Sequence, residues 1–225
     1  MISRYGWGRL LVAITLAACG PEDRTPAVGE APPTPISGER GRIVFLGTSL
    51  TAGLGLDPEQ AYPALIQRKL DAAGLPFEAV NAGVSGETSA GARRRIDWLL
   101  QEPAAVLVIE TGANDGLRGL DVDSLRSNIQ AIIDEAKRQS PKPAIVLVGM
   151  RAPPNLGFGY SRRFDRVYSE LADENDLPLV PFLLDGVAGR AALNQSDMMH
   201  PTAEGQQRMA ETVWGVLEPV LRRTS

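Results

Sequence analysis

A serine, a histidine and an aspartate of this chain are of the types that together perform acyl transfer. Ser49 follows the apolar run 42–46, which predicts a hydroxyl just past the carboxyl end of a buried strand. His200 is the only histidine, and therefore the only side chain that titrates near neutrality without special tuning. Asp197 can reach the far ring nitrogen of His200 if the two residues between them form a tight turn. A nucleophile, a base and an acid that orients the base are the groups that such catalysis needs.

Two further residues could stabilise negative charge on a reacting oxygen. Asn114 offers a side-chain NH2 group soon after the apolar strand predicted over 105–110. Gly86 follows another predicted strand and offers a backbone amide that a substrate can approach without a Cβ in the way. Because the carboxyl ends of parallel strands meet at one edge of a sheet, we expect Ser49, Gly86 and Asn114 to lie close together.

Each of these residues also has an ordinary structural interpretation. Thr48 and Ser49 could simply cap a turn, and the single histidine could cap or pack against the last helix. Asn114 could hold the turn after its strand. The three consecutive arginines 93–95 point in different directions on a helix, so we interpret them as a solvent-exposed face.

Strands and helices alternate along the chain. Apolar runs predict strands over 42–46, 77–80, 105–110, 144–148 and 179–180, and helical spacing predicts helices over 62–73, 88–100, 124–138, 162–175 and 203–221. We therefore expect an α/β fold with a three-layer, doubly wound parallel sheet.

Composition and charge exclude several classes of function. The chain has 225 residues, enough for one substantial core, and we expect one folded domain. Its formal charge of −4 supplies no basic field for a phosphate backbone, so we expect no nucleic-acid partner. Cys19 is the only cysteine, which excludes an internal disulfide and, beside a single histidine, leaves no Cys/His cluster for zinc. We expect neither a metal nor a cofactor, and the sequence leaves the oligomeric state open.

The first 40 residues have the pattern of an export and tethering segment. Two arginines precede the apolar run 10–16, which is too short to span a bilayer but suits a signal-peptide core. The tetrad 16–19 resembles a bacterial lipobox, which implies that Cys19 is lipidated; an ordinary secretory signal with an incidental cysteine is the alternative. We expect a lipoprotein signal peptide over 1–18, a proline-rich flexible linker over 19–40 and the catalytic domain over 41–225. The protein would then face the periplasm of a bacterial envelope, and Gly20 favours the outer membrane by resemblance to sorted lipoproteins.

Four short motifs of the chain resemble the four conserved blocks of the SGNH hydrolases, also called GDSL esterases. In order along the chain they are Gly47-Thr48-Ser49-Leu50, Gly86, Gly112-Ala113-Asn114-Asp115 and Asp197-Met198-Met199-His200. The likeness is to the bacterial thioesterase, lysophospholipase and arylesterase branch. It implies a flavodoxin-like strand order and an acyl ester or thioester substrate.

The resemblance also implies roles for single residues. Ser49 would be the nucleophile, Asp197 and His200 would complete the triad, and the Ser49 amide, Gly86 and Asn114 would form the oxyanion hole. The expected activity is a serine ester hydrolase acting through an acyl-enzyme. A carbohydrate O-deacetylase and a non-catalytic envelope lipoprotein on the same scaffold are the alternatives.

The chain departs from the family motif at two positions. Thr48 replaces the usual aspartate beside the nucleophile, and we expect its hydroxyl to cap the turn with activity retained. Ala113 replaces a frequent glycine, which implies a negative φ there.

The segment 151–160 follows the fourth predicted strand on the same sheet edge as Ser49. We expect a loop that borders the acyl channel, with Leu156, Phe158 and Tyr160 as its apolar wall. An idle surface loop is the alternative.

Overall fold

A parallel sheet of five strands organises the part of the chain that the computed structural model describes, residues 40–224. The strand order is β2–β1–β3–β4–β5. The strands are β1 (Gly41–Gly47), β2 (Phe77–Gly83), β3 (Val106–Glu110), β4 (Ala144–Val148) and β5 (Leu179–Val180). This is the predicted doubly wound order, in which the winding direction reverses between β1 and β3.

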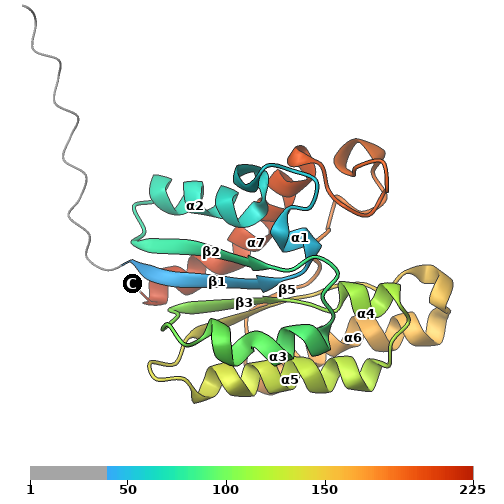
Figure 1. Ribbon diagram of the computed structural model, residues 1–225, viewed down its shortest axis with the longest axis horizontal. Helices are drawn as coiled ribbons and strands as arrows, with labels where there is room; N and C mark the ends of the chain where they lie inside the picture. Colours follow the sequence, from blue (N-terminus) through green and yellow to red (C-terminus); the bar gives the residue numbers. More distant parts are fainter. Residues whose placement is uncertain (1–39, 225) are drawn as a thin grey trace, which may run out of the picture. The chain divides into compact units, whose positions relative to one another are not determined.

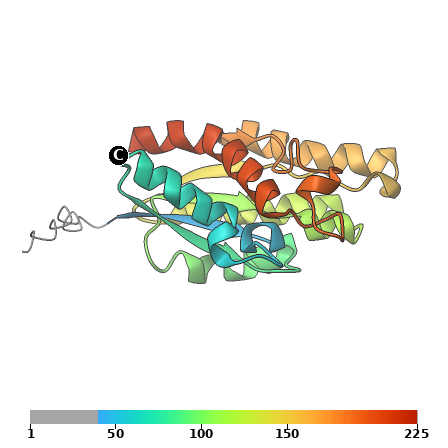
Figure 2. The same ribbon diagram turned by 90° about the horizontal axis from the view of Figure 1, so that it is seen from above.

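Helices cover both faces of the sheet (Figure 1). One face carries α2 (Tyr62–Ala72) and α7 (Ala203–Thr224), which Figure 2 shows side by side. The other face carries α3 (Ser89–Leu99), α5 (Val122–Arg138) and α6 (Phe158–Asn175). The central strands are therefore buried from both sides, which explains why all five residues of β3 are buried and four of them are apolar.

Two short helices lie in segments where the sequence predicts no helix. They are α1 (Ser49–Ala52), directly after β1, and α4 (Ala113–Leu117), soon after β3. Helices of four and five residues are too short to show the helical spacing of apolar residues on which the prediction rests. Contacts from distant segments stabilise both helices, as the site below shows.

Other element boundaries differ by a few residues from the prediction. β2 continues to Gly83, three residues beyond its predicted end, and α6 begins at Phe158 rather than at residue 162. Gly157 at the start of α6 has a φ of 86°, a conformation that glycine adopts readily. Gly157 therefore ends the preceding loop, and Gly159 lies in the first turn of α6.

The predicted signal peptide, Cys19 and nearly all of the predicted linker lie outside the described residues. Among residues 40–224, no helix combines the length and the apolar character needed to cross a bilayer. The same residues contain no group of three metal-ligating side chains that could hold an ion.

Candidate active site

Ser49 lies at the first position of α1, where the chain leaves the carboxyl end of β1. Its side chain is largely covered, with a residue exposure of 8%. Gly47 allows this tight turn, since a Cβ there would lie 1.9 Å from Thr51 Oγ1. Thr48 precedes the helix as its N-cap, and its hydroxyl accepts the Leu50 N–H at 3.4 Å. The expected capping by Thr48 in place of the usual aspartate is confirmed.

A buried carboxylate at the end of β3, Glu110, stabilises the turn around Ser49 by hydrogen bonds. Glu110 is 0% exposed and accepts the Thr48 N–H at 2.7 Å, the Thr48 hydroxyl at 3.0 Å and the Thr51 hydroxyl at 2.8 Å. Burial raises the pKa of this carboxyl, although its hydrogen bonds pull in the opposite direction. Glu110 is not among the residues that the sequence motifs predict for the site, although a single charge at the end of an otherwise apolar strand was a signal for it.

His200 connects Ser49 to Asp197 by two short hydrogen bonds. Ser49 Oγ lies 2.9 Å from His200 Nε2, and His200 Nδ1 lies 2.6 Å from Asp197 Oδ2. The predicted tight turn is present: Asp197 Oδ1 accepts the N–H groups of Met199 and His200, and Met198 takes a positive φ of 56°. These hydrogen bonds, led by the one from the imidazole, hold the pKa of Asp197 well below its usual value.

Gly86 and Asn114 line the same pocket as Ser49, as their positions at neighbouring strand ends predicted. Asn114 Nδ2 donates one hydrogen to the Glu87 carbonyl at 3.0 Å, which leaves its second hydrogen available. Gly86 has a φ of 78°, and its carbonyl accepts a hydrogen bond from Arg118 at 2.9 Å.

The expected negative φ at Ala113 agrees with its place at the start of α4. The carboxylate of Asp115 also connects α4 to the start of α3, because it accepts the backbone N–H of Ser89 at 2.8 Å and its hydroxyl at 2.6 Å. This contact from α3 helps to explain why the segment is helical.

The pocket has a volume of about 390 Å³ and mostly apolar walls. The apolar side chains that line the pocket together with Ser49 include Leu50, Leu54, Leu117, Met150, Pro153, Leu184, Met198 and Met199. Leu184 and its neighbours come from the segment 181–190, which carries no motif that could have singled them out.

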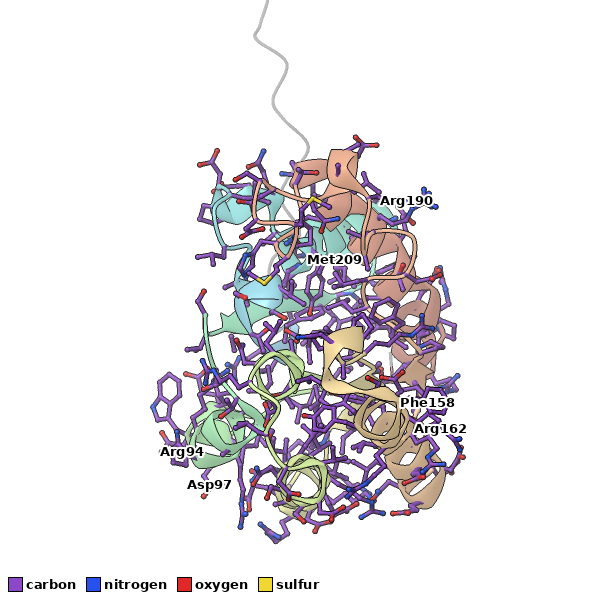
Figure 3. All side chains as sticks on the ribbon, turned by 90° about the vertical axis from the view of Figure 1, so that its right-hand side faces the viewer. Arg94, Asp97, Phe158, Arg162, Arg190 and Met209 are labelled. Carbon is purple, nitrogen blue, oxygen red and sulfur yellow. The ribbon has the colours of Figure 1, made fainter. Side chains whose placement is uncertain are left out.

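The segment 151–160 contributes less to the pocket than predicted. Arg151 and Pro153 are among the described residues that line the pocket, whereas Leu156, Phe158 and Tyr160 are not. Phe158 is 76% exposed on the outer side of α6 beside Arg162 (Figure 3). The predicted apolar wall is therefore wrong. The Tyr160 hydroxyl donates to the Leu120 carbonyl at 2.7 Å, and Leu156 lies in the turn Pro154–Leu156 that precedes α6.

A family model described as the GDSL-like lipase/acylhydrolase family matches residues 45–208. Esterase TesA of Pseudomonas aeruginosa is 41% identical over 180 residues, which are 80% of this chain and 89% of that protein. Thioesterase 1/protease 1/lysophospholipase L1 of Escherichia coli K12 is 34% identical over 185 residues, 81% of this chain and 86% of that protein.

A solved structure has the same fold. The psychrotrophic esterase EstA of Pseudoalteromonas sp., inhibited by monoethylphosphonate, is 33% identical with a TM-score of 0.76, covering 81% of this chain and 99% of its own. The matched region contains all the residues of the triad and pocket named above. The chain therefore belongs to the GDSL-like lipase/acylhydrolase family, the SGNH hydrolases.

Proposed function

We propose that this protein is a serine ester hydrolase that acts on acyl esters or thioesters through an acyl-enzyme on Ser49. The observation that carries the proposal is the continuous hydrogen-bonded chain from Ser49 through His200 to Asp197, which opens into an apolar pocket. The names of the relatives, an esterase and a thioesterase/lysophospholipase, support the same class of reaction.

Acylation begins when Ser49 Oγ forms a bond to the carbonyl carbon of the substrate. The hydroxyl proton passes to His200 Nε2, and the carbonyl electron pair moves onto oxygen to give a tetrahedral oxyanion. Asp197 stabilises the imidazolium through its bond to Nδ1. The free hydrogen of the Asn114 amide and the backbone N–H groups of Gly86 and Ser49 stabilise the oxyanion.

Collapse of this intermediate expels the alcohol or thiol, which takes the proton from His200 Nε2. Water then reacts in the same way: it gives one proton to Nε2, and its oxygen bonds to the acyl carbon. When the second tetrahedral intermediate collapses, Ser49 recovers the proton and the carboxylic acid is released. The apolar walls of the pocket favour an acyl chain over a polar sugar ring as the bound part.

A panel of p-nitrophenyl esters and acyl thioesters of increasing chain length tests the proposal. Wild-type protein should hydrolyse them, and Ser49→Ala should show no turnover above background while it keeps its melting temperature. The matched control is Ser169→Ala, which removes an exposed serine hydroxyl that donates within α6 to the Arg166 carbonyl, away from the residues that line the pocket. Turnover by Ser49→Ala at near wild-type rate would reject the acyl-enzyme, and no hydrolysis by the wild type would reject the class of reaction.

We further propose that Cys19 is lipidated and anchors the protein in a bacterial envelope, facing the periplasm, with the outer membrane as its location. The support is the tetrad 16–19 after a charged and apolar leader. Mass spectrometry of membrane-extracted protein should find a lipidated N-terminal cysteine, and Cys19→Ala should remain unprocessed. An unmodified mature N-terminus at or beyond Cys19 would contradict the anchor, whereas lipidated protein in inner-membrane fractions would contradict only the location.

A further inference from the structure

One of the three consecutive arginines of α3 is engaged at the active-site end of the sheet. Arg95 has a side-chain exposure of 19%, and the Glu87 side chain that it meets is 10% exposed. Arg95 Nε donates to Glu87 Oε1 at 2.8 Å, and one terminal nitrogen donates to Oε2 at 2.6 Å. The predicted solvent-exposed face is therefore wrong for Arg95. A two-point contact of this kind fixes direction as well as distance.

The same guanidinium also reaches the strand that carries the nucleophile. Its terminal nitrogen donates to the Gly47 carbonyl at 3.3 Å, two residues before Ser49. The Gly47 carbonyl accepts the Val84 N–H at 2.9 Å as well, so the loop after β2 is joined to the end of β1 at this point. Arg95 thus contacts both segments at the place where they come together.

Glu87 is bound from the other direction by the proposed oxyanion donor. Its carbonyl accepts Asn114 Nδ2, and its backbone N–H donates to the Val84 carbonyl at 3.2 Å. Gly86, the second proposed donor, is the residue immediately before it. Gly91 leaves room for this arrangement, since a Cβ there would lie 2.6 Å from Glu87 Cγ. A movement of Glu87 would therefore displace both donors.

We infer that Arg95 is a positioning residue of the oxyanion hole. Its guanidinium joins the Glu87 carboxylate to the Gly47 carbonyl, and it thereby fixes Gly86 and Asn114 relative to Ser49. The inference rests on the proposed function, because it takes Gly86 and Asn114 as oxyanion donors. Arg95 does not line the pocket and acts only through these neighbours. Donors that are held in place before reaction stabilise charge most effectively, and a shift of about 1 Å costs roughly 100-fold in rate.

Arg94 supplies a matched control on the same helix. It is exposed and does not line the pocket, and Figure 3 shows it with Asp97 on the outer side of α3. Arg95→Met removes the guanidinium and keeps most of the aliphatic stem, and Arg94→Met makes the same change one residue earlier. Arg95→Lys keeps a positive charge without the planar fork, and Glu87→Gln keeps the shape of the partner without its charge.

The test measures kcat and KM on p-nitrophenyl butyrate for these variants. Rates are divided by active sites titrated to completion with diethyl p-nitrophenyl phosphate, and melting temperatures are taken on the same preparations. Arg95→Met should lower kcat by about 10- to 100-fold with KM within about twofold of wild type, because the negative charge on oxygen develops on the way to the tetrahedral intermediate and is absent from the bound substrate. Arg95→Lys and Glu87→Gln should lie between Arg95→Met and wild type, and Arg94→Met should be indistinguishable from wild type.

Several results would overturn the inference. The first is a kcat of Arg95→Met, per titrated active site, that lies within twofold of wild type, whether or not the melting temperature changes. The second is a rise in the KM of Arg95→Met with its kcat unchanged. An equal loss in Arg94→Met would also overturn it, because the effect would then come from the charge of the helix. If Arg95→Met does not fold, Arg95→Lys and Glu87→Gln decide by the same criteria. A failure of the proposed function is seen in a different measurement: Ser49→Ala, with Arg95 intact, would then hydrolyse the ester at a rate near that of the wild type.

Discussion

The two sides of the active site are held in opposite ways. The turn that carries Ser49 is fixed by Glu110, a carboxylate that is 62 residues away from Thr48 in sequence and fully buried. The turn that carries His200 begins with Asp197, whose side chain accepts hydrogen bonds from the backbone N–H groups of Met199 and His200. The side chain of Asp197 is 39% exposed.

This difference separates what tertiary structure contributes from what local structure contributes. Hydrogen bonds to Glu110 are shielded from water, so they strengthen one another and place the nucleophile with the rigidity of the sheet. Hydrogen bonds within the Asp197 turn compete with water, and they need only four consecutive residues. The nucleophile side therefore depends on the fold, and the base side depends mainly on its own sequence.

The largest expected effects concern the base side. His200→Ala should lower kcat on the order of 10⁶-fold, because Ser49 then has no proton acceptor. Asp197→Asn should lower kcat by roughly 10⁴-fold, because an amide favours the wrong imidazole tautomer. His200→Ala should keep a melting temperature near wild type, whereas Asp197→Asn should lose some stability because the carboxylate accepts three hydrogen bonds in the folded state. Single-turnover kinetics on the two variants and the wild type should show the larger loss for His200→Ala. An Asp197→Asn variant as active as wild type would mean that Asp197 does not take part in catalysis.

The next effect concerns a donor on the nucleophile side. Asn114→Ala should lower kcat by about 10²–10³-fold with little change in KM, since its free hydrogen meets an oxyanion that exists only in the tetrahedral intermediate. Kinetics and melting temperature measured together separate this role from a structural one. A large fall in melting temperature with unchanged turnover per folded molecule would show that Asn114 only holds its turn.

A pH-dependent effect on stability is expected at Glu110. Since burial raises its pKa above the usual 4.5, the folded state binds the proton more tightly than the unfolded state does. The contribution of Glu110 to the free energy of unfolding is therefore lost as the pH rises from 4.5 through the folded-state pKa. Glu110→Gln cannot ionise, so its free energy of unfolding does not change for this reason. Urea unfolding at pH 4.5 and pH 8 should show the variant gaining on wild type, and a shift in favour of wild type would contradict the assignment.

Asp197 should behave with the opposite sign. Its pKa is held below the usual 3.8 by the imidazole and two backbone N–H groups, so its contribution to stability is complete above 3.8. That contribution is lost as pH falls from 3.8 toward the lower folded-state value. The stability deficit of Asp197→Asn should therefore shrink below pH 3.8, and a deficit that grows on acidification would argue against these hydrogen bonds.

The smallest expected effect tests backbone strain in the base-side turn. Met198 takes a left-handed φ of 56° that costs an ordinary residue about 1 kcal/mol. Met198→Gly should relieve this cost and recover less than about 1 kcal/mol, because glycine also gains freedom in the unfolded chain. The gain is measured by urea unfolding. A loss of stability would mean that the half-exposed Met198 side chain contributes more through packing than its backbone costs.

The sequence by itself determined the alternation of strands and helices, and it named the three residues that the structure joins by hydrogen bonds, Ser49, His200 and Asp197. Apolar runs of a fully covered parallel sheet are readable because burial on both faces leaves no polar alternation. Asp197 and His200 were readable because their contact needs only a four-residue turn. Ser49, Gly86 and Asn114 were readable because parallel strands bring their carboxyl ends to one edge.

Only the tertiary structure decided which charged residues support that edge. Glu110 and Arg95 bind partners that are near in space but distant in sequence. A single charge at the end of an apolar strand marked Glu110 without naming its partners, and Arg95 looked like the other arginines of a solvent-exposed face. The two short helices α1 and α4 have the same origin. Contacts between distant segments outweigh local propensity there, because a buried hydrogen bond that is left unmade costs more than a turn residue loses in a helix.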